Sequence, residues 1–206
     1  VAAAINACQM EPVNGPQRTA RAKLMMHLML ICDAGSGRPP TFPDDPPLAE
    51  GAAAPVPLPQ PGAAWSSPER RALQTAALLG LAPAIDPALR DCDYGRWRGR
   101  SLAEIGAQEP DGLAAWIADP AARPHGGESV CDVVARVGRW LDERCGDRGR
   151  VVAVTHGTVI RAAIVHAIRA GPASCPHIDV PPLSRTLLTC HAGTWRLREH
   201  GLRRGA

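Results

Sequence analysis

The hydrophobic and polar positions along the chain alternate between strand-like and helix-like segments. Residues 27–31 form a short apolar run that is suited to a buried strand, and residues 150–157 form a second run rich in β-branched side chains. The first run leads into a glycine-rich turn and the second into a helical pattern. This alternation favours an α/β domain.

The most regular helical periodicity lies in residues 126–149. Apolar side chains recur there at intervals of three and four, so they share one helix face: Val130, Val133, Val134, Val137, Trp140 and Leu141. Residues 63–81 predict a short strand, then a helix with a Ser N-cap, a proline near its first turn and an end at Gly80. Further helices are predicted within 101–108 and 158–171.

The last segment, residues 177–200, predicts strands joined by a turn at Ala192 and Gly193. Strands separated by helices imply three layers, a mostly parallel sheet flanked by helices. Ligands of such sheets bind at the carboxyl ends of the strands. Asp33 and His156 each come directly after a predicted strand, so we expect both at the same edge of the sheet.

The length of 206 residues fits one sizeable α/β core, and we predict a single domain over residues 25–206. Residues 1–24 carry no periodicity and are predicted to be a disordered extension. The two methionines Met25 and Met26 stand next to the first predicted strand, where we expect translation of the natural chain to start.

Charge and composition exclude several kinds of partner. The 23 basic and 20 acidic residues are scattered, which argues against a nucleic-acid surface or a polybasic membrane anchor. No window reaches the roughly 18 apolar residues of a membrane helix. The seven cysteines are an odd number without a C-x-x-C pair, which indicates reduced thiols. We therefore predict a soluble cytoplasmic protein; its oligomeric state is left open.

Four stretches carry a family resemblance: LMLICDAGS (28–36), SSPERRALQTA (66–76), LRDCDYGRWRG (89–99) and VVAVTHGTVIRA (151–162). With DPPLAEG (45–51) and PHGGES (124–129), they resemble the histidine phosphatase superfamily, also called the phosphoglycerate mutase-like family. The resemblance implies that family's α/β fold and phosphoryl transfer through a phosphohistidine. We predict no cofactor and no metal ion.

The resemblance also implies roles for individual residues. Arg71 matches a phosphate-binding arginine, and a guanidinium pairs bidentately with phosphate oxygens. His156 matches a histidine that donates hydrogen bonds to the phosphoryl group, and Asp91 matches the acid that protonates the leaving oxygen. The alternative for Asp91 is a surface-loop carboxylate. Arg38, in the glycine-rich loop, is a further phosphate-binding candidate, with a solvated loop residue as the alternative.

The first motif departs from the family pattern. Where the family has Arg-His-Gly or Arg-His-Ala, this chain has Cys32, Asp33 and Ala34, so an arginine and the nucleophilic histidine are implied to be lost. His27 stands at the beginning of this strand and not after its end, so it does not replace the lost histidine. The carboxylate of Asp33 brings a negative charge toward the phosphate dianion. Two like charges about 4 Å apart repel by roughly 4 kcal/mol at an effective dielectric near 20, so we expect this site to bind phosphate weakly.

Three functions remain open from the sequence. The first is hydrolysis of a small phosphorylated metabolite, with activity reduced or lost, in which Asp33 would be the nucleophile. The second is an inactive pseudophosphatase that binds an anionic ligand or a protein partner. The third is a repurposed enzyme that uses Asp33 and His156 for acid–base chemistry on another substrate.

Overall fold

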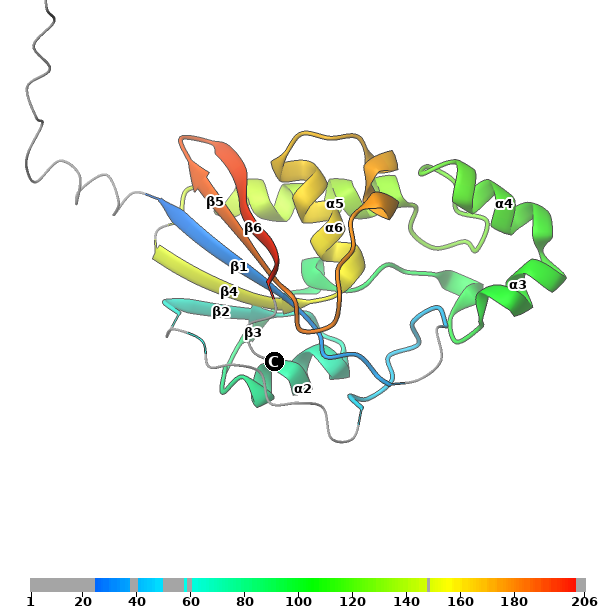
Figure 1. Cartoon of the computed structure of the whole chain (residues 1–206), viewed down its shortest axis with the longest axis horizontal. Helices are drawn as coiled ribbons and strands as arrows, with labels where there is room; N and C mark the ends of the chain where they lie inside the picture. The colour runs from blue at the N-terminus through cyan, green and yellow to red at the C-terminus, as the bar shows by residue number, and fades with distance from the viewer. Residues whose placement is uncertain (1–24, 38–40, 50–57, 59–60, 148, 203–206) are drawn as a thin grey trace, which may run out of the picture.

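A mixed β-sheet forms the centre of the chain (Figure 1). The computed structural model describes residues 25–37, 41–49, 58, 61–147 and 149–202, so the predicted extension over 1–24 lies outside the described residues. The strands run in the order β3-β2-β4-β1-β5-β6. Their bounds are β1 Met26–Cys32, β2 Ala63–Ser66, β3 Ala84–Ile85, β4 Gly149–Thr155, β5 Arg185–His191 and β6 Thr194–Leu202.

The pairing of β1 explains why two distant residues meet. β1 runs parallel to β4 with Cys32 opposite Thr155, so the residues that follow both strands, Asp33 and His156, emerge side by side. β2 and β3 continue the parallel part, whereas β5 and β6 are antiparallel and turn at Ala192 and Gly193. The predicted three-layer α/β fold is confirmed, with an antiparallel hairpin at one edge.

Helices cover both faces of the sheet (Figure 1). The helix α2 (Arg70–Leu78) lies on one face, and α5 (Val130–Arg144) and α6 (Gly157–Ala167) lie on the other. Two short helices, α3 (Leu102–Gln108) and α4 (Pro110–Ala118), stand to one side of these layers. Short 3-10 helices are η1 (Pro87–Leu89), η2 (Gly95–Trp97) and η3 (Pro172–His177).

The predicted face of α5 is its buried face. Val133, Val137, Trp140 and Leu141 are each at most 2% exposed and pack toward the sheet. The helix begins at a capping box in which the Ser129 hydroxyl accepts from the backbone N–H of Asp132, while the Asp132 carboxylate accepts from that of Ser129. Apolar periodicity and a capped start together made this helix predictable.

The start of α2 differs from the prediction. Its N-cap residue is Glu69, which makes no capping hydrogen bond through its side chain, so the predicted Ser N-cap is wrong. Ser67 is instead completely buried and its hydroxyl contacts His156. The predicted end holds, because Gly80 takes the left-handed backbone (φ 69°) that glycine adopts without a steric penalty.

The cysteines also differ from the prediction. Cys145 and Cys190 form a disulfide that joins the end of α5 to β5, with Cα atoms 5.4 Å apart, a usual separation for such a bond. The expectation of reduced thiols is therefore wrong for this pair. Cys32, Cys92, Cys131 and Cys175 are free.

None of the helices in the described ranges combines the length and apolar character that crossing a bilayer requires.

Candidate active site

Asp33 is held rigidly where β1 ends. Its backbone N–H donates to the carbonyl oxygen of Thr155 (2.8 Å), which continues the β1–β4 pairing by one residue. Its Oδ1 accepts from the backbone N–H of Gly35 (2.9 Å), a turn that needs the left-handed backbone of that glycine (φ 79°). Asp33 is 5% exposed, so the direction of its carboxylate is fixed by the chain around it.

Arg71, in the first turn of α2, lies between two carboxylates. Its Nε is 3.2 Å from Asp33 Oδ1, and its Nη2 donates to Asp91 Oδ2 at 2.6 Å. All three residues are at most 7% exposed. Burial opposes the charge of Arg71, but the carboxylates of Asp33 and Asp91 outweigh burial and raise the pKa of the guanidinium.

His156, the N-cap residue of α6, has a carboxylate at each ring nitrogen. Its Nδ1 is 2.9 Å from Asp33 Oδ2, and its Nε2 is 3.0 Å from Glu69 Oε2 and 2.7 Å from Ser67 Oγ. A carboxylate accepts hydrogen bonds only, so both nitrogens carry a proton and we assign the ring as an imidazolium. In this assignment Nδ1 does not accept from Arg71 Nη2, which lies 3.0 Å away and donates to Asp91 Oδ2.

The pKa shifts follow from these contacts. Burial alone would lower the pKa of His156, but Asp91, Asp33 and Glu69 outweigh it and raise the pKa to about 9. Burial would raise the pKa of Glu69, yet the hydrogen bond and charge of His156 bring it down to about 2. The pKa of Asp33 is likewise held below its usual value by His156 and Arg71, against the effect of burial.

Stability should therefore fall as the pH rises from neutral to about 10. The pKa of His156 is about 9 in the folded chain against 6.5 for the free side chain. The stabilisation is complete below 6.5, declines between 6.5 and 9, and is lost above; its size is on the order of 3 kcal/mol. Urea unfolding at about pH 6 and about pH 10 measures the loss.

The matched control for this titration is Glu69→Gln, which removes one of the two carboxylates that bond directly to the imidazolium. The variant should show a smaller fall in the free energy of unfolding over the same pH range. An equal fall in both proteins would assign the pH dependence to other groups and contradict the charged state of His156.

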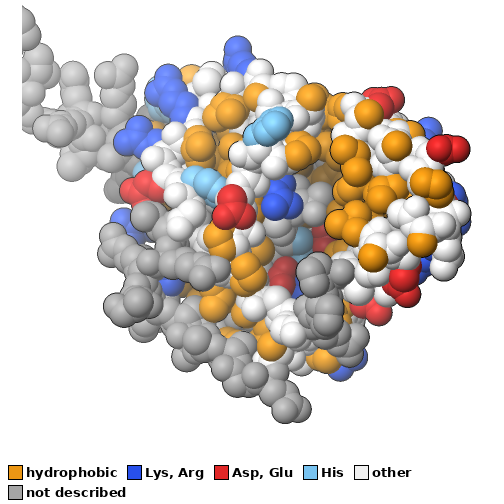
Figure 2. Space-filling view, turned by 45° about the vertical axis from the view of Figure 1, so that its right-hand side comes forward, with side chains coloured by type: hydrophobic (Ala, Val, Ile, Leu, Met, Phe, Trp, Pro, Cys, Tyr) orange, Lys and Arg blue, Asp and Glu red, His pale blue; other side chains and the backbone are white. Residues whose placement is uncertain are grey.

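The charges around this site do not favour the binding of a phosphate dianion. Two cations, Arg71 and the His156 imidazolium, face three carboxylates, those of Asp33, Asp91 and Glu69. A small cavity of about 170 Å³ lies beside them; its lining includes Arg90, Arg98, Asp44 and Asp45. In the space-filling view, side chains of both charges and histidine lie in a recess beside a large apolar surface (Figure 2).

The structure brings together Asp33, Arg71, Asp91 and His156, four of the candidates from the sequence. Arg38 lies outside the described residues, so its role stays a prediction. No group of three or more His, Cys, Asp or Glu side chains in the described part of the chain is arranged to hold a metal ion.

Sequence reasoning missed Glu69 and Ser67, although both belong to the segment that contains Arg71. Their place in the sequence could have identified them, because the turn between β2 and α2 lies at the same edge of the sheet as Asp33 and His156. Cys32 is buried, and burial, together with the charge of Asp33, raises the pKa of its thiol. A nucleophilic thiolate is therefore disfavoured at this position.

Comparison with known proteins places the fold and the site in context. The chain is 34% identical over 131 residues to glucosyl-3-phosphoglycerate phosphatase of Mycobacterium tuberculosis, which covers 57% of this chain and 59% of the relative. It is 35% identical over 127 residues to a bifunctional protein of the same species, of which it covers 35%. The chain thus spans less than two thirds of the length of these curated relatives.

A solved structure agrees over more of the chain. The mycobacterial glucosyl-3-phosphoglycerate phosphatase in complex with inorganic phosphate has a TM-score of 0.74 at 30% identity, covering 85% of this chain and 97% of that one. Residues 49–203 match the family model of the histidine phosphatase superfamily, branch 1. The matched region includes Arg71, Asp91 and His156 and begins after Asp33. The chain belongs to the histidine phosphatase superfamily.

Proposed function

We propose that this chain binds a small phosphorylated or anionic metabolite weakly and hydrolyses phosphomonoesters slowly or not at all. The observation that carries the proposal is the position of one carboxylate: Asp33 contacts both Arg71 and His156, the two groups expected to hold a phosphoryl group. By the family resemblance, residue 33 is the place of the nucleophilic histidine and residue 32 that of an arginine. Here those residues are Asp33 and Cys32.

Asp33 supports this proposal because it is an anion built into the site. Its Oδ1 faces Arg71 Nε at 3.2 Å and its Oδ2 faces His156 Nδ1 at 2.9 Å, so both cations already have a negative partner. An incoming phosphate would share these donors and approach a fixed negative charge. At about 4 Å and an effective dielectric near 20, that repulsion is roughly 4 kcal/mol for unit charges.

The same contacts make Asp33 a poor nucleophile. A carboxylate can attack phosphorus to form an acyl phosphate, but it must present a free oxygen to the substrate. Both oxygens of Asp33 are engaged, one by Arg71 and Gly35 and the other by His156. We infer that turnover through Asp33 is slow compared with turnover through an imidazole at the same position.

The relatives support phosphate as the ligand class. The mycobacterial relative is named a phosphatase, and its solved structure holds inorganic phosphate. In this chain Arg71 and His156 would provide the donors for such a group, and Asp91 lies 2.6 Å from Arg71. The role of Asp91 follows from the resemblance and remains part of the proposal.

The acid–base alternative is less well supported. Asp33, His156 and Ser67 form a hydrogen-bonded chain in the order of a Ser-His-Asp triad. A general base must be unprotonated to accept a proton, whereas the pKa of His156 is about 9. A protonated ring donates hydrogen bonds and does not accept a proton, which favours the phosphate-binding function.

Hydrolysis of an aryl phosphate tests the proposal. We expect phosphate release by the native protein near the buffer background, and release at least about tenfold faster by the double variant Cys32→Arg, Asp33→His, a difference of about 1.4 kcal/mol in the barrier. The double variant supplies the cation and the neutral nucleophile that the family motif has. Native activity that disappears in Asp33→Ala would instead make Asp33 a working nucleophile.

A further inference from the structure

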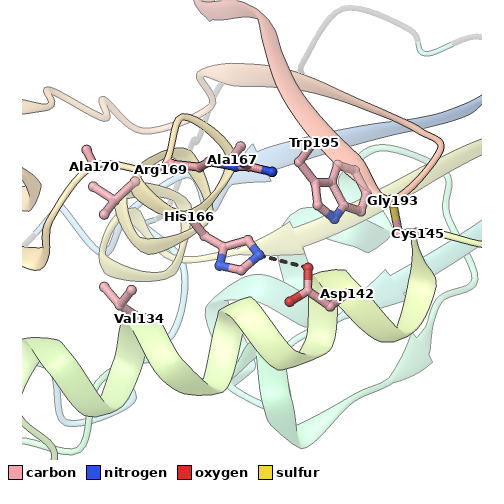
Figure 3. A pocket seen from close by; sticks show the side chains of 10 residues that line it. Val134, Asp142, Cys145, His166, Ala167, Arg169, Ala170, Gly193 and Trp195 are labelled. Carbon is pink, nitrogen blue, oxygen red and sulfur yellow. Dashed lines mark hydrogen bonds and ion pairs between the residues drawn. The ribbon is translucent and has the colours of Figure 1, made fainter.

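A second cavity opens at the C-terminal end of α6, whereas His156 stands at the N-terminal end of this helix (Figure 3). Its volume is about 550 Å³, within the range of about 300–1,000 Å³ that is typical of small-molecule sites. The walls come from α5, from the last turn of α6 and from the β5–β6 hairpin, and we call it the α6-end cavity. Its lining includes Val134, Asp142, His166, Arg169, Ala170 and Trp195.

Arg169 provides a positive charge that the described residues leave unpaired. It follows α6 directly in a left-handed backbone conformation (φ 57°). Its side chain is exposed, and no ion pair or side-chain hydrogen bond joins it to another residue of the described ranges. Figure 3 shows it reaching across the cavity toward Trp195. A guanidinium in this position suits a planar carboxylate, which it can bind through two parallel hydrogen bonds.

Trp195 provides a second donor. The residue is 5% exposed, and its indole Nε1 is a buried atom without a hydrogen-bond partner among the described residues. Such unpaired donors are uncommon in folded proteins and call for an explanation. The N–H edge of the ring is turned to the same side as His166 and Asp142 (Figure 3). A ligand oxygen at this edge would give the indole N–H the partner that it lacks.

The opposite wall limits the charge of the ligand. His166 Nε2 is 2.9 Å from Asp142 Oδ1, so this imidazole already has an anionic partner. The ring packs closely on α5, because a Cβ built at Gly138 would lie 2.7 Å from His166 Nδ1. With Asp142 nearby, the cavity disfavours a phosphate dianion more than a single carboxylate. Val134 and Ala170 add an apolar surface for the body of the ligand.

We propose that the α6-end cavity is a second ligand site, which takes a small organic monocarboxylate with an apolar or aromatic body. The carboxylate binds Arg169 and the indole N–H of Trp195, and the body lies against Val134 and Ala170. His156 and this end of α6 are about 15 Å apart, at about 1.5 Å of rise per residue along the helix. The site is thus separate from the candidate active site.

The test uses benzoate as the probe and the full chain labelled with ¹⁵N. The indole N–H signals of the five tryptophans are followed during the titration, and Trp195→Phe assigns the signal of Trp195. We expect a saturable shift of that signal. Inorganic phosphate, added as a competitor, should leave the benzoate titration unchanged, which separates this site from the one at Arg71.

Two variants decide the role of Arg169. Arg169→Asn, which tolerates the left-handed backbone, should weaken benzoate binding at least about tenfold. Arg198→Gln, an exposed arginine on the same hairpin as Trp195, should bind as the native protein does. Equal binding by Arg169→Asn, no saturable shift of Trp195, or equal shifts of all the indole signals would overturn the proposal.

Discussion

Replacing Asp33 with asparagine should raise the affinity for inorganic phosphate about a hundredfold, which corresponds to about 2.8 kcal/mol. Asparagine keeps the shape of the side chain and its oxygen can still accept from Gly35 and Arg71, but the negative charge is gone. Its NH2 group then faces His156 Nδ1 and does not accept from it, so the hydrogen bond of Nδ1 is free for a phosphate oxygen. Arg71 then loses one of its two anionic partners, and a phosphate oxygen can take that place. Isothermal titration calorimetry of both proteins with phosphate at about pH 7 measures the change.

The control for this prediction is Asp93→Asn, which removes a carboxylate from the same region of the chain. Asp93 pairs with Arg98 and accepts from Gly95, and it makes no contact with Arg71 or His156. The affinity of the Asp93→Asn variant for phosphate should equal that of the native protein. If Asp33→Asn bound phosphate no more tightly than the native chain, the carboxylate of Asp33 would not be what opposes the anion.

Replacing Arg71 with methionine should destabilise the protein by about 3–5 kcal/mol. Methionine fills part of the space but removes the guanidinium that contacts both Asp33 and Asp91, each at most 7% exposed. Asp33 keeps His156 at 2.9 Å, whereas Asp91 loses its contact at 2.6 Å and retains His156 only at 4.0 Å. Removing one partner of a buried ion pair costs more than the pair contributed, because the remaining charge stays buried with too little compensation. Urea unfolding at about pH 7 gives the free energy of unfolding for both proteins.

Arg70→Met is the matched control, since Arg70 is the neighbouring residue on α2 and its side chain is exposed. Its loss should change stability by less than about 0.5 kcal/mol. In the double variant Asp33→Asn, Arg71→Met, part of the loss should be recovered because one buried charge has been removed. If Arg71→Met lowered the free energy of unfolding no more than Arg70→Met does, the buried carboxylates would not need the guanidinium for stability.

Part of the site could be predicted because residues that directly follow parallel strands lie at one edge of the sheet. Asp33 and His156 follow two apolar runs, and parallel neighbours bring such residues together whatever their separation in the sequence, here 123 positions. Arg71 and Asp91 were found only through the family resemblance. Periodicity alone leaves both as ordinary charges of a helix and a loop.

Other contacts could not be predicted, because a serine or glutamate before a helix can cap the helix, face solvent or bond a buried side chain. The Ser67-Pro68 sequence before a helix favours an N-cap, yet burial against His156 decides the outcome for Ser67. Glu69, directly before α2, has the pattern of a solvated acid and instead bonds the same imidazole. The disulfide joins positions 45 residues apart, and an odd set of cysteines does not reveal which two meet.

The position of β1 in the sheet also limits how the site can change. β1 pairs with β4 on one side and β5 on the other, so two neighbouring strands hold its register at once. Sliding β1 to bring His27 to the place of Asp33 would require a shift of six residues, about 20 Å along the strand. A histidine can therefore come to position 33 only by substitution, because no shift of β1 in its register supplies one.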